Sequence, residues 1–136
     1  MKKYYIEPIG IIQSEIKNRE DAPIFSIDGA PNAYLKLSPK YISRLDRMKA
    51  GDNIIVITWL HLADRHVLRV HPQRDSSRPI TGVFSTRSSD RPNPLGLHRV
   101  RVFAINDEIL YIGPIEVVDG TPVVDIKPVV EQSKDF

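Results

Sequence analysis

The 136-residue sequence contains no cysteine, a single tryptophan and no apolar run long enough to cross a membrane. The absence of cysteine excludes disulfides and cysteine-ligated metal sites. The start of the chain, Met1 to Tyr5, lacks the apolar core of a signal peptide, so we expect a cytoplasmic protein without a membrane segment. The seven glycines are scattered, and none forms a dinucleotide-binding or Walker-type fingerprint. A nucleotide bound by this chain would therefore not be held by a glycine-rich strand-to-helix turn.

Arginine is distributed unevenly along the chain. The net charge is only +2, but the segment from Arg65 to Arg101 contains eight arginines, no lysine and two acids, Asp75 and Asp90. Arginine recognises phosphate and carboxylate through several planar donors, so this block favours an anionic partner such as RNA, DNA or a nucleotide. A solvated face whose arginines pair with acids of the C-terminal third is the alternative.

Short β-branched and aromatic segments separated by turn residues dominate the sequence. Ser38 and Pro39 supply an N-cap and a first helical residue, which predicts one short helix through Ile42, Leu45 and Met48. Long loops are expected at 15–31 and 71–79. We expect strands at 4–12, 33–37, 53–60, 80–85, 97–105, 109–112, 115–118 and 122–126, with weaker alternation over 62–70.

Many short strands, one helix and no alternating strand–helix units predict an all-β fold, an antiparallel barrel or sandwich. The length of the chain suits a single domain, which we expect to cover residues 1–130. The last residues, 131–136, are polar and are expected to form a frayed tail.

The stretch 84–97 has the composition of a shaped loop. Pro92, Pro94 and Gly96 exclude an ordinary helix or central strand, because proline fixes φ and removes a hydrogen-bond donor. Arg87 and Arg91 are thus carried on a stiffened backbone, where the cost of ordering them around a ligand is reduced. A solvated connection with turn chemistry is the alternative.

A second unusual stretch, 119–128, carries Asp119 and Asp125 on a predicted turn and the strand after it. These carboxylates either cap the turn or face the same cavity as the arginine loop.

The histidines do not have the spacing of a known metal motif, so we expect no bound metal. A Ser-His-Asp hydrolase stays open, although no serine lies in a nucleophile-elbow pattern. The four histidines are His61, His66, His71 and His98.

Residues 82–88 and 91–97, followed by 118–128, closely resemble motifs of the tRNA threonylcarbamoyladenosine N6-methyltransferase family, also described as TsaA-like. Residues 9–14 and 59–61 are similar to that family as well. The resemblance implies a β-barrel methyltransferase without the Rossmann fold, which binds S-adenosylmethionine, acts on tRNA and often forms a homodimer. It also implies a short form without the C-terminal domain of the bacterial members, which leaves other methyl acceptors open.

The resemblance also implies roles for particular residues. The candidate cofactor contacts are Pro23, Ile24, Phe25, His61, Leu62, Arg87, Leu97, Pro114, Ile115 and Glu116. Arg91 and Asn93 are expected to contact substrate or to shape the loop. The acceptor nitrogen is a poor nucleophile, so a base should help, and Asp125, Asp119 and His61 are the candidates. A module that binds S-adenosylmethionine or RNA without catalysis is the main alternative.

Overall fold

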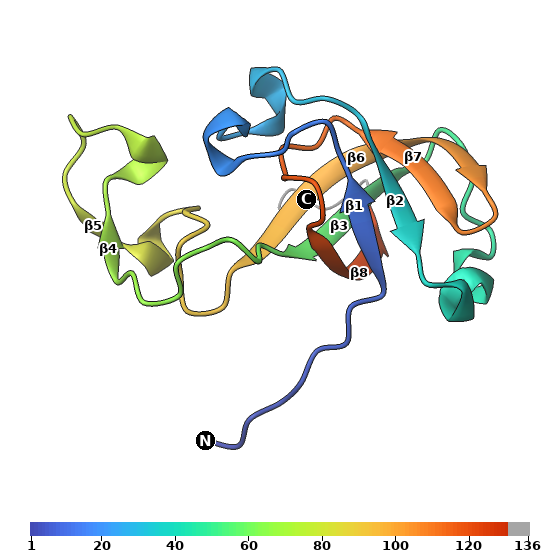
Figure 1. Ribbon diagram of the computed structural model, residues 1–136, viewed down its shortest axis with the longest axis horizontal. Helices are drawn as coiled ribbons and strands as arrows, with labels where there is room; N and C mark the ends of the chain where they lie inside the picture. Colours follow the sequence, from blue (N-terminus) through green and yellow to red (C-terminus); the bar gives the residue numbers. More distant parts are fainter. Residues whose placement is uncertain (131–136) are drawn as a thin grey trace.

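The computed structural model describes residues 1–130, and the predicted polar tail at 131–136 lies outside the described residues. Six antiparallel strands close into a barrel in the order β1-β2-β7-β6-β3-β8 (Figure 1). The prediction of an all-β, mainly antiparallel barrel is confirmed. The barrel strands are β1 (Gly10–Gln13), β2 (Ala33–Leu37), β3 (Asn53–Trp59), β6 (Leu95–Asn106), β7 (Ile109–Gly113) and β8 (Pro122–Pro128).

Strict alternation of side chains builds the interior of the barrel. In β2, Ala33, Leu35 and Leu37 are buried while Tyr34 and Lys36 face outward, as the two-residue period of a strand requires. Each fully buried aliphatic side chain contributes about 1.5–3 kcal/mol relative to exposure. The most buried members of this core are Ile12, Leu35, Val56, Val102, Leu110, Ile112, Ile115 and Val123.

Strand β8 pairs with β1 on one edge and with β3 on the other, which closes the sheet. The register between β3 and β8 shifts between Ile57 and Thr58: Ile57 lies opposite Asp125, whereas Thr58 lies opposite Val123. Such a bulge leaves one residue unpaired and bends the strand. Alternation along β3 buries Thr58 and leaves Ile57 half-buried, and the bulge lets Val123 be buried opposite Thr58 while Asp125 stays half-buried opposite Ile57.

The two ends of the barrel differ. At one end, Asp107 and Glu108 form the tight turn of the β6–β7 hairpin, and Asp107 takes the positive φ of 54° that this turn needs. At the other end, an arm of residues 60–94 leaves β3 and returns into β6 (Figure 1). The arm contains the short pair β4 (Arg69–Val70) and β5 (Thr81–Gly82).

The predicted helix after Ser38 is present as the 3-10 helix η3 (Pro39–Leu45). It ends at Leu45, so Met48 lies beyond it, and Arg47 at φ 70° cannot continue a helix. The other helical segments are single 3-10 turns within loops. These are η1 (Arg19–Asp21), η2 (Ser26–Asp28), η4 (Pro72–Arg74) and η5 (Val83–Ser85).

Four strand predictions were wrong in extent or in kind. The first strand begins at Gly10, because residues 1–8 are exposed and pair with no strand. Most of 62–70 forms turns, and in 80–85 only Thr81 and Gly82 are paired before the η5 turn. Residues 115–118 are not a strand: Ile115 and Val117 enter the core from a segment that covers one end of the barrel.

No helix among the described residues is long and apolar enough to span a bilayer.

Gly96 is predicted to be intolerant of substitution. A Cβ at this position would lie 2.5 Å from Nε2 of His98 and closer still to Oγ1 of Thr58. We expect Gly96→Ala to reduce the free energy of unfolding by about 1–3 kcal/mol, as overpacking does. Gly82→Ala is the matched control, because nothing lies within 4 Å of its added carbon. Equal urea midpoints for the two variants would contradict the prediction.

Candidate functional site

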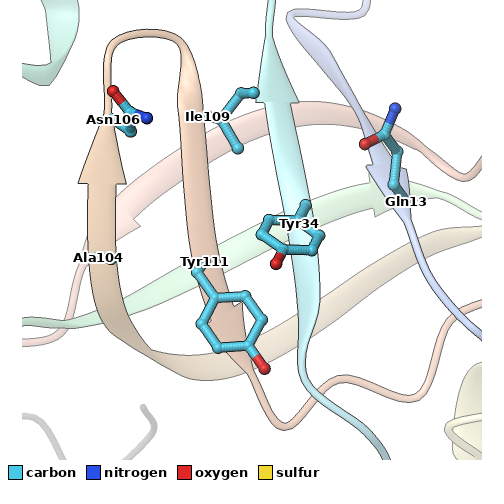
Figure 2. A pocket seen from close by; sticks show the side chains of 6 residues that line it. All are labelled: Gln13, Tyr34, Ala104, Asn106, Ile109 and Tyr111. Atoms are coloured by element: carbon cyan, nitrogen blue, oxygen red, sulfur yellow. The ribbon is translucent and has the colours of Figure 1, made fainter.

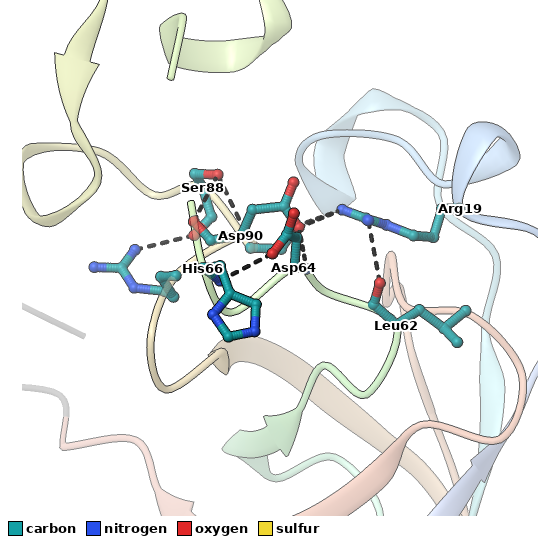
Figure 3. Close-up of polar contacts among 8 residues, drawn as sticks. Arg19, Leu62, Asp64, His66, Ser88 and Asp90 are labelled. Atoms are coloured by element: carbon teal, nitrogen blue, oxygen red, sulfur yellow. Dashed lines mark hydrogen bonds and ion pairs between the residues drawn. The ribbon is translucent and has the colours of Figure 1, made fainter. Parts of the chain in front are cut away.

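One carboxylate ties together three loops at the end of the barrel that carries the arm (Figure 3). Oδ1 of Asp90 accepts a hydrogen bond from Nη2 of Arg19 at 2.9 Å and another from the backbone N–H of Asp64 at 2.8 Å. Arg19 also donates from Nη1 to the backbone oxygen of Leu62 at 3.1 Å. The early loop, the segment after β3 and the proline-rich loop are therefore fixed relative to one another.

The proline-rich loop, residues 84–97, is held in shape from within. Nη1 of Arg91 donates to the backbone oxygens of Thr86 and Ser88 at 3.1 and 3.0 Å, and Oγ of Ser88 accepts the N–H of Asp90 at 3.2 Å. The Arg91 guanidinium also lies 5.9 Å from the centre of the Phe84 ring. Of the two predicted roles for Arg91, these contacts favour loop shaping.

Asn93 takes part in a second set of contacts on the same loop. Arg65 donates from Nε to the backbone oxygen of Pro92 at 2.7 Å and from Nη2 to Oδ1 of Asn93 at 3.4 Å. The Arg65 guanidinium lies 5.1 Å from the ring centre of Trp59, at the end of β3. Trp59 is half-buried beneath this arginine, so it belongs to the support of the loop rather than to the centre of the core.

The predicted cofactor contacts His61, Leu62 and Leu97 lie where β3 and β6 meet the proline-rich loop. The backbone N–H of Leu60 donates to the oxygen of Pro94 at 2.8 Å, and His61 and Leu62 follow in an exposed turn. Leu97 faces outward from β6 opposite Ile57, and Asp125 flanks Ile57 on its other side. Leu97 and Asp125 thus share one row on the outer wall.

The early loop presents apolar surface. Ile24 and Phe25 are 40% and 39% exposed, and Pro23 before them is half-buried. Arg87 is exposed on the proline-rich loop, and Phe84 beside it is 80% exposed. Exposed rings and aliphatic groups of this kind suit contact with a planar apolar ligand such as a purine.

The three predicted cofactor contacts at 114–116 differ in burial and in the direction of their side chains. Pro114 is exposed, whereas Ile115 is fully buried in the core and its N–H donates to the oxygen of Pro31. Glu116 turns toward the interior, where Oε1 lies 2.6 Å from Nδ1 of His98. Nε2 of His98 lies 2.7 Å from Oγ1 of Thr58.

His98 was not among the predicted site residues, although the sequence carries a signal for it. It stands one residue after Leu97, at the inward position of a strand whose neighbours alternate, and only 5% of it is exposed. A polar ring at a core position requires partners for both nitrogens. Those partners, Thr58 and Glu116, come from distant parts of the sequence.

Asp119 fastens the segment after β1. Its Oδ1 accepts the backbone N–H of Ser14 at 2.9 Å, its own N–H donates to Ile16, and Oδ2 lies 3.2 Å from Nζ of Lys17. The Ser14 hydrogen bond, with the Lys17 ammonium nearby, holds the pKa of Asp119 below its ordinary value. A carboxylate stabilised in this way is a weak proton acceptor.

The hollow on the outer wall lies away from these residues (Figure 2). It runs across β1, β2, β7 and β6 near the β6–β7 hairpin, and none of the predicted cofactor contacts lines it. Within residues 1–130, no three histidine, aspartate or glutamate side chains are grouped as a metal site would require. The residues that line the hollow are Gln13, Tyr34, Ala104, Asn106, Ile109 and Tyr111.

Residues 11–135 match the family model of the tRNA-methyltransferase O N-terminal domain. The chain belongs to the tRNA-methyltransferase O family. The family expected from the motifs is thereby confirmed. A crystal structure of TrmO superposes with a TM-score of 0.80 at 28% identity and covers 99% of this chain. TrmO from Pseudomonas aeruginosa gives 0.78 at 27%. In both cases the chain spans 61% of the solved chain.

Three relatives named as S-adenosyl-L-methionine-binding proteins are similar over most of their length. A probable S-adenosyl-L-methionine-binding protein of Methanothermobacter thermautotrophicus is 40% identical, over 93% of this chain and 90% of its own. A probable S-adenosyl-L-methionine-binding protein of Methanocaldococcus jannaschii is 35% identical, over 91% and 90%. An S-adenosyl-L-methionine-binding protein of Archaeoglobus fulgidus is 34% identical, over 90% and 86%.

Removal of the Asp90 carboxylate should loosen the three loops together. We expect Asp90→Ala to raise the hydrogen-exchange rate of the Asp64 amide about tenfold or more, because that amide loses its acceptor. Asp75→Ala, which removes only contacts local to the arm, is the control. Unchanged exchange at Asp64 in the Asp90 variant would show that the carboxylate is not the anchor.

The lowered pKa of Asp119 predicts a pH-dependent contribution to stability. That contribution is present above the unfolded value near 3.8 and is lost as pH falls through the lower folded value. At pH 7 we expect Asp119→Asn to lower the melting temperature by about 3–5 °C, and the difference should shrink toward pH 3. Asp28→Asn, at an exposed position, should match the wild type. A gap that is constant from pH 7 to pH 3 would refute this.

Proposed function

We propose that this chain is an S-adenosylmethionine-dependent methyltransferase that N6-methylates threonylcarbamoyladenosine beside the anticodon of tRNA. The observation that carries the proposal is that both family motifs flank strand β3 of a tRNA-methyltransferase O family barrel, because Ile57 pairs with Leu97 on one side and with Asp125 on the other. Because several relatives are named only as S-adenosyl-L-methionine-binding proteins, a binding module without catalysis is the second candidate. A methyltransferase with a different acceptor is the third.

The side chains at this end of the barrel suit S-adenosylmethionine chemically. The exposed Ile24, Phe25 and Leu97 supply apolar surface for an adenine ring, and Arg87 supplies a cation for a carboxylate. Glu116 supplies negative charge for the positive centres of the ligand. When bound, the cofactor supplies an electrophilic methyl group on a sulfonium.

The protein must position the acceptor and receive its proton. Positioning by the fixed loops around Asp90 removes part of the entropic barrier. Among the candidate bases, Asp119 is engaged with Ser14 and Lys17, which hold its pKa below the ordinary value and make it a weak proton acceptor. His61 follows Leu60, whose N–H donates to Pro94 of the proline-rich loop, and Asp125 flanks Ile57 opposite Leu97; we propose that one of them receives the proton.

The arginine block supports tRNA as the partner. Two of its guanidiniums on the exposed arm are steadied by backbone oxygens: Arg69 donates to Ile80 of the arm at 3.3 Å, and Arg74 donates to Ala22 of the early loop at 3.2 Å. Arg69 and Arg74 each donate through Nη2 in these contacts, so the other N–H groups of the guanidinium can face solvent. Such a surface suits the phosphate backbone of RNA, since a steadied guanidinium loses less freedom on binding.

We also propose that the protein acts as a homodimer in the cytoplasm, where tRNA is found. Light scattering at micromolar concentration tests the dimer, because a monomer would have the chain mass of 15.5 kDa.

The function is tested in two steps with the full chain. Calorimetry should show S-adenosylmethionine binding, and incubation with tRNA should add a methyl group to threonylcarbamoyladenosine, detected by nucleoside mass spectrometry. If His61 or Asp125 is the base, His61→Ala or Asp125→Asn should lower kcat about 10²–10⁴-fold, and Asp125→Asn should do so with little change in cofactor affinity. Binding without methylation would favour the module without catalysis.

The arm should dominate the electrostatic part of RNA affinity. We expect Arg69→Ala and Arg74→Ala each to weaken tRNA binding and to reduce the slope of log affinity against log salt by roughly 0.7–0.9. Arg44→Ala, on η3 outside the arginine block, is the matched control. The same loss in the Arg44 variant would indicate diffuse attraction rather than an arm-specific contact.

A further inference from the structure

Three side chains form a continuous polar chain inside the barrel. Oγ1 of Thr58 on β3 lies 2.7 Å from Nε2 of His98 on β6, and Nδ1 of His98 lies 2.6 Å from Oε1 of Glu116. The His98 side chain is 4% exposed and that of Glu116 is 19% exposed. The chain therefore begins in the dry interior and ends at a carboxylate with partial access to solvent.

The contacts of His98 select one arrangement of its protons. A carboxylate can only accept, so Nδ1 must carry the hydrogen that is shared with Glu116. In the neutral ring Nε2 is then an acceptor, and the Thr58 hydroxyl is its donor. Glu116 thus selects the Nδ1–H tautomer of His98, and the Thr58 hydroxyl supports that tautomer by donating to Nε2.

The backbone makes room for this ring. Thr58 lies opposite Gly96 in the β3–β6 pairing, and a side chain at Gly96 would occupy the space of the Thr58–His98 contact. Gly96 follows Pro94 by two residues, which places the polar chain directly behind the proline-rich loop.

Glu116 keeps one oxygen available for a ligand. In the part of the chain that the structure describes, Oε1 bonds to His98 and Oε2 has no hydrogen-bond partner. The Glu116 side chain is 19% exposed, so its carboxylate is within reach of a ligand at the surface. An exposed carboxylate oxygen on a fixed side chain suits a cationic ligand group.

We propose that His98 is a positioning residue of the cofactor site: locked by Thr58, it holds the Glu116 carboxylate so that Oε2 meets a positive centre of S-adenosylmethionine. This inference rests on the proposed function. The positive centre is the sulfonium or the ammonium of the ligand. His98 itself stays in the interior and acts only through Glu116.

A double-mutant cycle in cofactor affinity tests the proposal. Measured by calorimetry, Glu116→Gln and His98→Leu should each weaken S-adenosylmethionine binding by about 10–100-fold, the effect of losing a hydrogen bond to a charged group. The double variant should bind no more weakly than the weaker single variant. Wild-type affinity in His98→Leu, or losses that multiply in the double variant, would overturn the proposal.

Conservative variants separate positioning from simple packing. His98→Asn keeps an N–H close to the position of Nδ1 and should recover most of the affinity. If His98→Leu does not fold, Thr58→Val keeps the ring and should still weaken binding a few-fold. Thr121→Val is the matched control, because it removes another buried hydroxyl, one that donates to Val118. It should lower thermal stability alone, and an equal loss of affinity there would count against a specific role for His98.

S-adenosylhomocysteine, which lacks the sulfonium charge, distinguishes the two positive centres. If Glu116→Gln weakens S-adenosylmethionine binding alone, the sulfonium is the partner; if both ligands weaken equally, the ammonium is. If neither weakens, the proposal fails.

Nitrogen-15 spectra of the imidazole provide a readout that needs no cofactor. The wild type should show the Nδ1–H tautomer of His98, and Thr58→Val should disturb it. The opposite tautomer in the wild type would overturn the proposal.

If the wild type does not bind S-adenosylmethionine, the proposed function fails and the inference fails with it. Binding with independent losses in the cycle would overturn the inference alone.

Discussion

The pairing of β8 with both β1 and β3 is the constraint on which the rest of the structure depends. Closure of the sheet divides every strand into an inner and an outer face. Strand alternation turns Thr58 inward, and the register shift opposite it lets Val123 face inward while Asp125 stays on the outer wall. Without closure, Glu116 would have no interior to enter and His98 would be an ordinary exposed histidine.

The sequence was sufficient to predict the strands that alternate regularly. Residues 33–37 and 53–60 carry the two-residue period, and burial on one face of each strand enforces it. Residues 4–12 and 115–118 have similar composition but are not strands over those ranges. Strand formation needs a partner with unpaired backbone groups, and local composition does not report whether the fold provides one.

The candidate site was predictable only in part, for a similar reason. The stiffness of the proline-rich loop follows from Pro92 and Pro94, but its fastening by Arg19 depends on a contact between residues 71 positions apart. Asp119 and Asp125 look equivalent in sequence. The structure gives them different surroundings: Asp119 fastens the distant Ser14 and pairs with Lys17, whereas the Asp125 carboxylate contacts its chain neighbours Ile126 and Lys127 and lies on the outer wall, separated from Leu97 by Ile57. His98 was passed over because both of its partners are distant in sequence.

The position of Trp59 has a spectroscopic consequence. It is the only tryptophan in the chain, and it lies under Arg65, which hydrogen-bonds to Pro92 and Asn93 of the proline-rich loop. Indole emission depends on the charge and hydration around the ring. The protein therefore carries an intrinsic fluorophore beside the loop, and a shift in its emission would report rearrangement of that loop without any added label.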